Sequence, residues 1–178
     1  MKVISGKYKG RNILGYNIDG TRPTMDRVKE SIFSMLQSQI NDSICLDLFA
    51  GSGNLGIEAL SEGAKCCYFV DHNKKAISVL KENINNIGID NCFIVYNDYL
   101  KALDSFNIKF DIIFLDPPYN SNYIEKSIEK IIDNDLLSES GLIVCESDSI
   151  DRIVYPDNLV AVKDKKYGDK YVVFLRKM

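Results

Sequence analysis

The chain has 178 residues, 46% of them hydrophobic, which is enough for one compact domain with a buried core. The first residues lack the apolar run of a signal peptide, and no apolar stretch approaches the roughly 20 residues of a membrane helix. We therefore expect a soluble, cytoplasmic protein with no membrane contact. The five cysteines lie mostly in apolar runs without a Cys-x-x-Cys pair, which favours reduced core residues over a metal site.

The formal net charge of −3 is unevenly distributed along the chain. Residues 1–40 carry a balance of +4, and so do residues 163–178, so the segment between them is strongly acidic. Basic segments attract the phosphates of nucleic acids, although a charge cluster is as often only a solvated surface. The two basic ends alone therefore do not decide whether the protein binds a nucleic acid.

The first 40 residues predict an arm followed by a helix. Residues 2–11 mix β-forming residues with glycine, which is typical of a hairpin or an irregular arm. Arg22-Pro23-Thr24 then offers a turn and a helix start, and an apolar residue recurs every fourth position at Val28, Ile32, Leu36 and Ile40. We expect residues 1–40 to pack on a globular unit that spans residues 41–178.

Strands and helices alternate from residue 44 onwards. Apolar runs predict strands at 44–49, 66–70, 92–96, 110–115 and 142–145. Helices are expected between them at 55–61, 74–87, 99–103 and 124 to about 133. This order predicts an α/β fold with a mostly parallel sheet and helices on both faces. Residues 159–162 and 171–175 then predict an antiparallel hairpin, which completes a seven-stranded sheet.

A Gly-x-Gly-x-x-Gly motif at residues 51–56 joins the first strand to its helix. Such a loop lets a ligand approach the backbone and the helix N-terminus, so it suits the pyrophosphate of NAD as well as other nucleosides. Asp47, four residues before Gly51, favours a ligand with a cationic amine, because a carboxylate repels pyrophosphate. The chain also has no further region long enough for the substrate domain of most small-molecule dehydrogenases.

Acidic residues follow the next two strands. Asp71 ends the second strand about 20 residues after Gly51, a position from which a carboxylate accepts the hydroxyls of a ribose. Asp98 follows the third strand and could accept a hydrogen bond from an adenine amino group. His72 is the only histidine, and its place is more typical of an exposed helix start than of a base. These strand ends together predict an adenosine site.

Asp116-Pro117-Pro118-Tyr119 ends the fourth strand and predicts the chemistry. Two prolines fix the backbone and remove two N–H donors, so nearby carbonyls can face a substrate. Asp116 and the Pro117 carbonyl could accept hydrogen bonds from an exocyclic amino group, and Tyr119 could stack on its base. This arrangement favours methylation of a base amine by S-adenosylmethionine, whose sulfonium is already activated, so no metal is needed. The motif leaves open whether the target base is guanine or adenine.

These motifs resemble those of the RsmD-type bacterial 16S ribosomal RNA guanine-N2 methyltransferases, within the class I, Rossmann-like methyltransferases. The resemblance spans nearly the whole chain and rests on residues 3–11, 22–33, 47–56 and 116–119, of which 22–33 are the most family-specific. It implies methyl transfer from S-adenosylmethionine, leaving S-adenosylhomocysteine, to N2 of one guanine in 16S rRNA. The substrate would be the small ribosomal subunit or its assembly intermediate, with ribosomal proteins as part of it.

The resemblance also implies roles for individual residues. The catalytic residues would be Asp116, Pro117 and Tyr119. The cofactor would contact Asp47, Phe49, Ala50, Gly51, Ser52, Gly53, Asp71, His72, Asn97, Asp98 and Tyr99. The RNA would contact Lys7, Lys9, Arg11, Arg22 and Thr24. The chain departs from the family at Asp71-His72-Asn73, where Glu-x-Asp is common, and at Tyr99, where a small residue is common, which leaves the adenosine contacts open.

Three other functions stay open at this point. An adenine-N6 methyltransferase acting on RNA or DNA would use the same Asp-Pro-Pro-Tyr motif. An NAD-dependent oxidoreductase would use the same glycine loop. A non-catalytic RNA-binding assembly factor would need only the two basic ends.

Overall fold

The computed structural model describes every residue except 17–22 and 120–121, and it leaves the side chains of Pro23 and Thr24 undescribed. The helices in the described part of the chain are α1 (Pro23–Leu36), α2 (Asn54–Ser61), α3 (Lys74–Ile87), α4 (Tyr99–Ser105), α5 (Tyr123–Asp133) and the short 3-10 helix η2 (Ile150–Arg152). The strands are β1 (Ile44–Asp47), β2 (Cys66–Asp71), β3 (Cys92–Tyr96), β4 (Phe110–Leu115), β5 (Leu137–Ser147), β6 (Leu159–Tyr167) and β7 (Lys170–Lys177).

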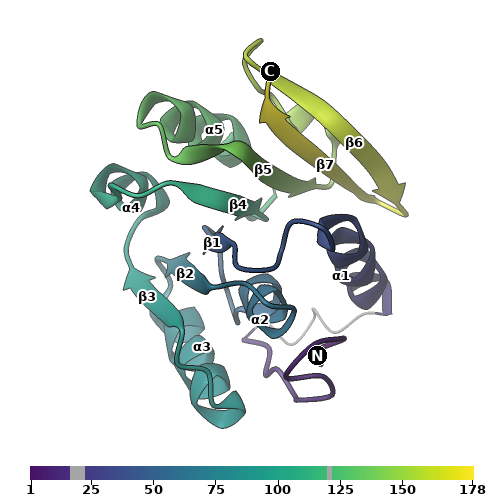
Figure 1. Ribbon diagram of the computed structural model, residues 1–178, viewed down its shortest axis with the longest axis vertical. Helices are drawn as coiled ribbons and strands as arrows, with labels where there is room; N and C mark the ends of the chain where they lie inside the picture. Colours follow the sequence, from purple (N-terminus) through teal and green to yellow (C-terminus); the bar gives the residue numbers. More distant parts are fainter. Residues whose placement is uncertain (17–22, 120–121) are drawn as a thin grey trace.

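The strands form one seven-stranded sheet in the order β3-β2-β1-β4-β5-β7-β6 (Figure 1). Strands β1 to β5 pair in parallel, and β7 pairs antiparallel with β5 and β6. The expected mostly parallel sheet with a C-terminal antiparallel hairpin is therefore confirmed. The strand order reverses between β1 and β4, and ligands of open α/β sheets bind at the carboxyl ends of strands beside such a reversal.

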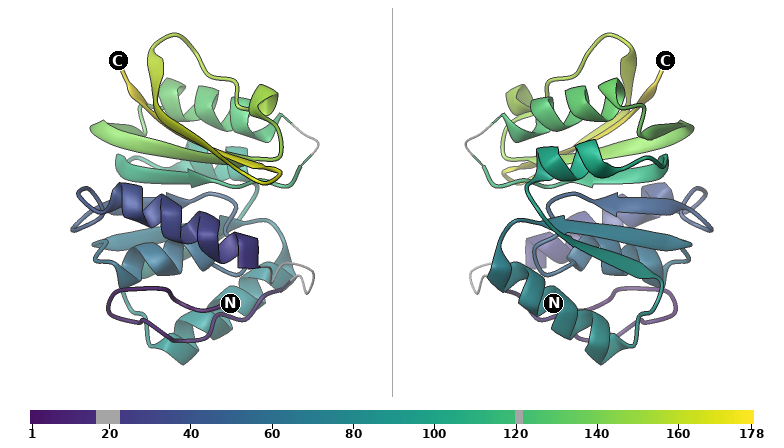
Figure 2. Two further views of the ribbon diagram at one scale, coloured as in Figure 1. Left: turned by 90° about the vertical axis from the view of Figure 1, so that its right-hand side faces the viewer. Right: turned by 90° about the vertical axis from the view of Figure 1, so that its left-hand side faces the viewer.

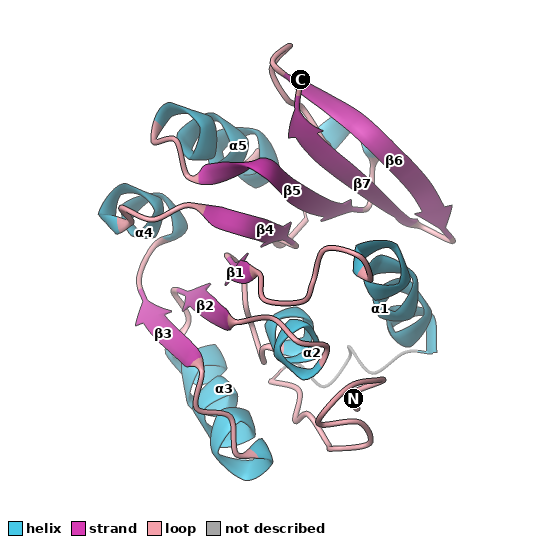
Figure 3. Ribbon diagram, viewed as in Figure 1, coloured by secondary structure: helices cyan, strands magenta, loops and turns pink. Residues whose placement is uncertain are grey.

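Helices cover both faces of the sheet, with α1, α2 and α3 on one face and α4 and α5 on the other (Figures 1 and 3). Successive strand residues point to opposite faces, so the sheet separates two cores. Cys45 and Phe114 belong to the core that also contains residues of α1, α2 and α3. Leu46 and Ile113 belong to the core that contains residues of α4 and α5. Burial on both faces explains why the parallel strands are almost continuously apolar.

The N-terminal segment is an irregular arm in which a single isolated bridge joins Lys2 and Asn12. Val3 and Ile13 are each 2% exposed and belong to the same core as α1, α2 and α3. Figure 2 shows the arm, in purple, crossing the helices on this face of the sheet. The arm is irregular as a whole, because residues 5–10 form bends and turns. Its ends nevertheless pair antiparallel as in a hairpin, through hydrogen bonds that join Met1 with Ile13 and Val3 with Arg11, so the structure combines the two expected forms.

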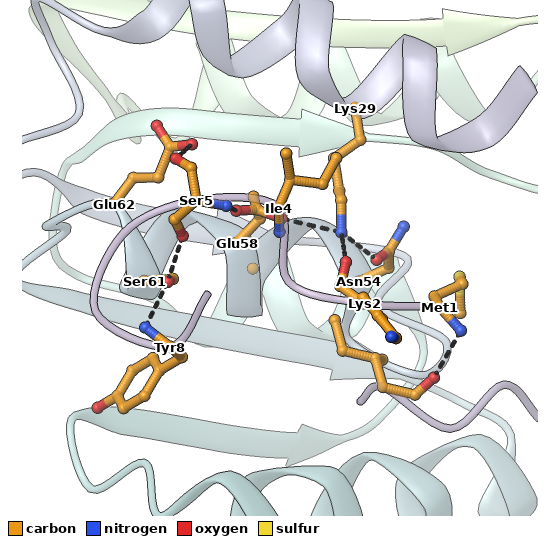
Figure 4. A network of polar contacts seen from close by, with 12 residues as sticks. Met1, Lys2, Ile4, Ser5, Tyr8, Lys29, Asn54, Glu58, Ser61 and Glu62 are labelled. Atoms are coloured by element: carbon orange, nitrogen blue, oxygen red, sulfur yellow. Dashed lines mark hydrogen bonds and ion pairs between the residues drawn. The ribbon is translucent and has the colours of Figure 1, made fainter. Parts of the chain in front are cut away.

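A buried ion pair ties this arm to α1 and α2 (Figure 4). Lys29 Nζ lies 2.9 Å from Glu58 Oε1, and both side chains are 1% exposed. The ammonium also donates to the Lys2 carbonyl at 2.8 Å and to Asn54 Oδ1 at 2.9 Å. The carboxylate accepts two backbone N–H groups of the arm, at 2.8 and 3.1 Å. Both buried charges are thus fully hydrogen-bonded, which is the condition for tolerating them in a core.

Several element boundaries differ from the sequence-based expectation, and the three largest differences lie in α1, β5 and β6. Helix α1 ends at Leu36, and Ile40 is buried in the turn that follows, where its N–H donates to the Leu36 carbonyl. Strand β5 begins at Leu137, across a shift in its register with β4. Strand β6 continues through charged residues to Tyr167, because it pairs with β7 along that length. An edge strand tolerates such a run of charges since one of its sides meets no other strand.

The remaining expectations concern cysteines and the membrane. All five cysteines are free, and Cys45, Cys67 and Cys145 are buried, whereas Cys66 and Cys92 are partly exposed. No helix in the described ranges is long and apolar enough to cross a bilayer.

Candidate active site

A pocket of about 490 Å³ opens at the carboxyl edge of the sheet. Its walls come from the segments that follow β1, β2, β3 and β4, from the end of β5, and from the arm and α1. Most of the expected site residues line it, namely Asp47, Phe49, Ala50, Gly51, Ser52, Asp71, His72, Asn97, Asp98, Tyr99, Asp116, Pro117 and Tyr119. The fold thus brings together residues from four strand ends.

The glycine loop turns sharply between β1 and α2. Gly51 and Gly53 have φ angles of 55° and 90°, in the left-handed region that favours glycine. A Cβ on Gly53 would lie 2.4 Å from Leu80 Cδ1, so this residue is also packed closely from below. Gly53 is buried and, unlike Gly51 and Ser52, does not line the pocket. Gly53 therefore supports the conformation of the turn instead of lining the pocket.

Two carboxyl groups, those of Asp47 and Asp71, accept hydrogen bonds from backbone N–H groups of this loop and of the start of α2. Asp47 is 2% exposed, and its Oδ2 accepts the Gly56 N–H at 2.9 Å. Burial, partly offset by that hydrogen bond and reinforced by Asp71, raises the pKa of Asp47 to about 7. Asp71 accepts the Gly51 N–H at 2.9 Å through Oδ2 and the Asn73 N–H at 2.8 Å through Oδ1. Asp71 therefore ties the loop to the start of α3, and the residue lines the pocket.

His72 stands beside this carboxylate without being enclosed. Its side chain is 76% exposed, and its Nδ1 lies 3.9 Å from Asp71 Oδ1. Such exposure agrees with a helix-start residue at the pocket rim.

The segment after β3 combines a helix cap with an aromatic wall. Asp98 Oδ1 accepts the N–H groups of the first turn of α4, from Leu100 and Lys101, at 3.0 and 3.1 Å. One oxygen of Asp98 is therefore engaged in capping. The rings of Phe49, Tyr99 and Tyr123 lie within 5.1–5.8 Å of one another, centroid to centroid, and all three line the pocket. These rings suit a flat, apolar ligand group.

Asp116 and its neighbours form the other half of the pocket. Asp116 is partly exposed and accepts no hydrogen bond from any residue that the structure describes. Burial, followed by the negative charge of Glu146, raises the pKa of the Asp116 carboxyl well above its usual range, and Lys170 opposes this effect. Tyr119 is 43% exposed, so one face of its ring can receive a ligand. The arrangement provides a hydrogen-bond acceptor beside a stacking surface.

Sequence reasoning missed a charged pair next to Asp116. Glu146, near the end of β5, is 6% exposed and lines the pocket. Lys170, the first residue of β7, places its Nζ 2.6 Å from Glu146 Oε1 and 5.9 Å from the centroid of the Tyr119 ring. A glutamate at the carboxyl end of an apolar run was a usable signal for Glu146. Lys170 gave no such signal, because only the folded hairpin brings it to this edge.

Other pocket residues that the sequence did not single out come from the N-terminal region and from α5. A Cβ added to Gly51 would lie 3.4 Å from the Tyr16 ring, and Met25, Lys29 and Tyr123 also line the pocket. Lys29 had a signal, since it lies on the apolar stripe of α1. The arm and α1 thus contribute to the same cavity as the strand ends.

The expected RNA-contacting residues do not gather at the pocket. Lys7, Lys9 and Arg11 are exposed, but the Lys7 N–H donates to the carbonyl of Ser61, the last residue of α2. Arg11 donates to the carbonyl of Asn86, near the end of α3. Because α2 and α3 start at the pocket, their ends lie toward the opposite edge of the sheet. Arg22 lies outside the described residues, and Thr24 lies in α1 with its side chain undescribed.

Within the described ranges, no group of three or more His, Cys, Asp or Glu side chains is arranged to hold a metal ion. The pocket carboxylates instead belong to separate strand ends.

Comparisons with known proteins agree with this architecture. The family described as Conserved hypothetical protein 95 matches residues 1–176. The "Putative rRNA methyltransferase YlbH" of Bacillus subtilis is 40% identical over 184 residues, which cover 99% of each chain. The "Ribosomal RNA small subunit methyltransferase D" of Haemophilus influenzae is 36% identical over 173 residues, covering 94% of this chain and 89% of the relative. The solved structure of "Putative methyltransferase yhhF from Escherichia coli" has a TM-score of 0.91 at 31% identity and covers 99% and 97% of the two chains.

The fold, the glycine loop and these similarities define a methyltransferase with the class I, Rossmann-like fold. The chain belongs to the Conserved hypothetical protein 95 family, and the resemblance to RsmD proteins that its motifs indicated is confirmed.

Proposed function

We propose that the protein transfers a methyl group from S-adenosylmethionine to the exocyclic N2 of one guanine in 16S rRNA. The observation that carries this proposal is the juxtaposition, in one pocket, of the glycine loop with Asp116 and Tyr119. The names of the relatives support ribosomal RNA of the small subunit as the substrate class. The motifs shared with RsmD-type enzymes favour guanine N2. The substrate would be the subunit or its assembly intermediate, in the cytoplasm, with ribosomal proteins beside the target.

The charge of the pocket supports S-adenosylmethionine over NAD. Five carboxyl groups line the cavity, at Asp47, Asp71, Asp98, Asp116 and Glu146, and the lining lysine, Lys29, is already paired with Glu58. Raised pKa values reduce the charge of Asp47 and Asp116, and Lys170 compensates Glu146, so Asp71 and Asp98 supply the uncompensated negative charge. An acidic cavity attracts a ligand that carries an ammonium and a sulfonium, and it repels a pyrophosphate. The residues present therefore fit the methyl donor, which supplies an activated methyl group on its sulfur.

The cofactor contacts are proposed residue by residue. Asp47 and the loop from Phe49 to Gly53 would surround the amino-acid end, with Gly53 acting through the shape of the turn. Asp71 would accept hydrogen bonds from the ribose, for which each of its oxygens retains a lone pair. Asn97, Asp98, Tyr99 and His72 would border the adenine. Asp98 would use the oxygen that does not cap α4.

Asp116, Pro117 and Tyr119 would handle the target base. The Asp116 carboxylate and the Pro117 carbonyl would each accept one hydrogen of the amino group, which orients the nitrogen toward the methyl donor. Tyr119 would stack on the base, a contact worth about 1–3 kcal/mol in comparable sites. Catalysis would then consist mainly of alignment. The Asp116 carboxylate would then take the proton that the methylated nitrogen loses, because it already accepts the hydrogen bond from that amino group.

The test measures transfer from labelled S-adenosylmethionine to small-subunit RNA from cells that lack the gene, followed by nucleoside analysis. We expect N2-methylguanine at one position. Asp116→Ala should reduce transfer at least about 100-fold while calorimetry still detects S-adenosylhomocysteine binding, since the variant removes a hydrogen bond to the base and none to the cofactor. Asp157→Ala, at an exposed loop position, is the matched control.

Other outcomes would identify the alternatives. Formation of N6-methyladenine would identify adenine, in place of guanine, as the target base. Binding of NADH without binding of S-adenosylhomocysteine would indicate an oxidoreductase. RNA binding without any methyl transfer would indicate an assembly factor, and transfer at the wild-type rate by Asp116→Ala would refute the role of that residue.

A further inference from the structure

Glu146 lies directly beside Asp116 at the pocket edge. Strands β4 and β5 are parallel neighbours whose last residue pair is Leu115 with Cys145, so Asp116, directly after β4, and Glu146, in β5, are the residues that follow this pair. Glu146 Oε1 receives the Lys170 ammonium at 2.6 Å. Its other oxygen, Oε2, accepts no hydrogen bond from a described residue, although the side chain lines the pocket. The site therefore holds a second acceptor that the residue roles above do not use.

The ion pair with Lys170 orients this acceptor. Two adjacent carboxylates in a partly closed site repel each other, and burying one costs several kcal/mol unless a cation compensates. Burial opposes the charge of Lys170, but Glu146 and Asp116 outweigh burial and raise the pKa of its ammonium above the usual range. The hairpin of β6 and β7 thus brings a positive charge to Oε1 of Glu146. Oε2 of this pocket-lining side chain stays available as an acceptor.

Guanine and adenine differ in the group that a second acceptor would meet. In guanine the N2 amino group is flanked by N1–H, a hydrogen-bond donor. In adenine the N6 amino group is flanked by an unprotonated N1, an acceptor. A carboxylate beside the amino-binding groups therefore gains a hydrogen bond with guanine and meets a lone pair with adenine. Proteins read unstacked RNA bases through such Watson–Crick edge contacts.

We propose that Glu146 determines the base specificity of the enzyme by accepting the N1–H of guanine, while Asp116 and the Pro117 carbonyl hold its N2 amino group. Lys170 is a positioning residue whose ion pair with Glu146 Oε1 fixes the Glu146 side chain in the wall of the pocket. This inference rests on the proposed guanine-N2 activity and adds the reason why guanine is preferred.

The experiment replaces the target guanine, identified by the nucleoside mapping above, with 2-aminopurine in a small-subunit RNA fragment. 2-Aminopurine keeps the N2 amino group but has an unprotonated N1. We expect wild-type kcat/KM to favour guanine by at least about 100-fold, because a site built to bond a donor rejects an analogue that lacks it. Glu146→Gln should lower kcat/KM for guanine and shrink the preference to less than about 10-fold, since its amide can donate to N1.

A matched control and a second pair of variants separate base reading from stability. Glu139→Gln, the same substitution at the exposed start of β5, should keep the wild-type preference. Lys170→Met should reduce the preference and Lys170→Arg should restore most of it. A merely structural ion pair would instead lower kcat/KM for both bases equally and leave their ratio unchanged.

The results that overturn the inference differ from those that overturn the proposed function. A wild-type preference near one would exclude base reading at N1 without reference to any variant. An unchanged preference in Glu146→Gln, with a melting temperature near that of the wild type, would remove Glu146 from the role while the guanine activity stands. Failure of the wild type to methylate guanine at all would overturn the proposed function and this inference with it.

Discussion

Asp47 shows how a residue of the site weakens the fold. Its carboxyl group is 2% exposed and, among the described residues, its hydrogen-bond donor is the backbone N–H of Gly56. Burial, with the nearby charge of Asp71, raises its pKa to about 7, whereas an unfolded aspartate has a pKa of about 4. Ionising this group in the folded protein therefore costs free energy. A neutral amide of the same shape would avoid that cost.

We expect Asp47→Asn to stabilise the fold increasingly as the pH rises. Below about pH 4 Asp47 is protonated in both states, and between about pH 4 and 7 the unfolded chain ionises first, which removes stability from the wild type. The advantage of the variant should grow over this window and level off above pH 7, at about 2–4 kcal/mol. Urea unfolding at a series of pH values measures it, and Asp157→Asn is the exposed control. A difference that stays flat from pH 5 to 8 would contradict the raised pKa of Asp47.

The sequence predicted the pocket residues at the ends of the parallel strands better than the residue that reaches the pocket through the pairing of β7 with β5. Asp47, Asp71 and Asp116 were identifiable because the carboxyl ends of parallel strands meet at one edge. The function of Asp98 as a helix cap was not recognised, since a capping residue and a ligand-binding residue look alike in sequence. Lys170 could not be assigned, because its contact with Glu146 depends on the register between β5 and β7.

At the scale of elements, helix α1 is joined to α2 and the arm through one buried cation. Lys29 lies on the apolar stripe of α1, where a lysine is unexpected, and its ammonium has Glu58, Asn54 and the Lys2 carbonyl as partners (Figure 4). Since Lys29 and Asn54 also line the pocket, this network connects the packing of the arm with the shape of the site.

Lys29→Met should destabilise the protein by about 3–5 kcal/mol, because it leaves the Glu58 carboxylate buried without its cation. The double variant Lys29→Met with Glu58→Gln should recover part of that loss, since no buried charge then remains uncompensated. Urea unfolding of the three proteins measures the effect. Lys130→Met removes the partly exposed ion pair with Asp104 and should cost less than about 1 kcal/mol. If Lys29→Met and Lys130→Met lower the free energy of unfolding equally, the buried ion pair does not stabilise the packing of the arm and α1 more than an exposed pair would.

Element boundaries were predictable where local pattern decides them and not where pairing does. Helix α3 runs from Lys74 to Ile87 as its apolar stripe predicted, and its ends carry an Asn73 cap and Gly88 in the left-handed conformation. The charged length of β6 and the early start of β5 gave no local signal of a strand. Both are strands because a neighbouring strand supplies hydrogen bonds, which no local pattern records.

At the scale of the whole molecule, the two basic ends lie at different distances from the pocket. The turn between β6 and β7 lies at the pocket edge, because Lys170 reaches Glu146 there, and Lys165 and Lys166 are exposed just before that turn. Lys7, Lys9 and Arg11 lie toward the opposite edge, beside the ends of α2 and α3. Figure 2 shows this separation, with the purple loop of the arm and the yellow tip of the hairpin on opposite sides.

This separation predicts different effects of neutralising each end. Replacing Lys165 and Lys166 by Gln should weaken both RNA binding and methyl transfer, since with the proposed substrate the phosphates that flank the target base would lie there. Replacing Lys7, Lys9 and Arg11 by Gln should weaken binding mainly of long or structured RNA, because only such a substrate reaches from the pocket to the far edge. Removing one lysine–phosphate or arginine–phosphate interaction should reduce the slope of log K against log salt by roughly 0.7–0.9.

Binding titrations at several salt concentrations, with a short RNA around the target and with the whole small-subunit RNA, separate the two ends. The arm variant should match the wild type on the short RNA and show a shallower salt slope on the long one, whereas the hairpin variant should show a shallower slope on both. If the arm variant keeps the wild-type slope on the long RNA, its basic residues are a solvated surface and the RNA is held by the pocket edge alone. If the arm variant also shows a shallower salt slope on the short RNA, then the short RNA reaches Lys7, Lys9 and Arg11. In that case the distance between the arm and the pocket does not determine which RNA each end binds.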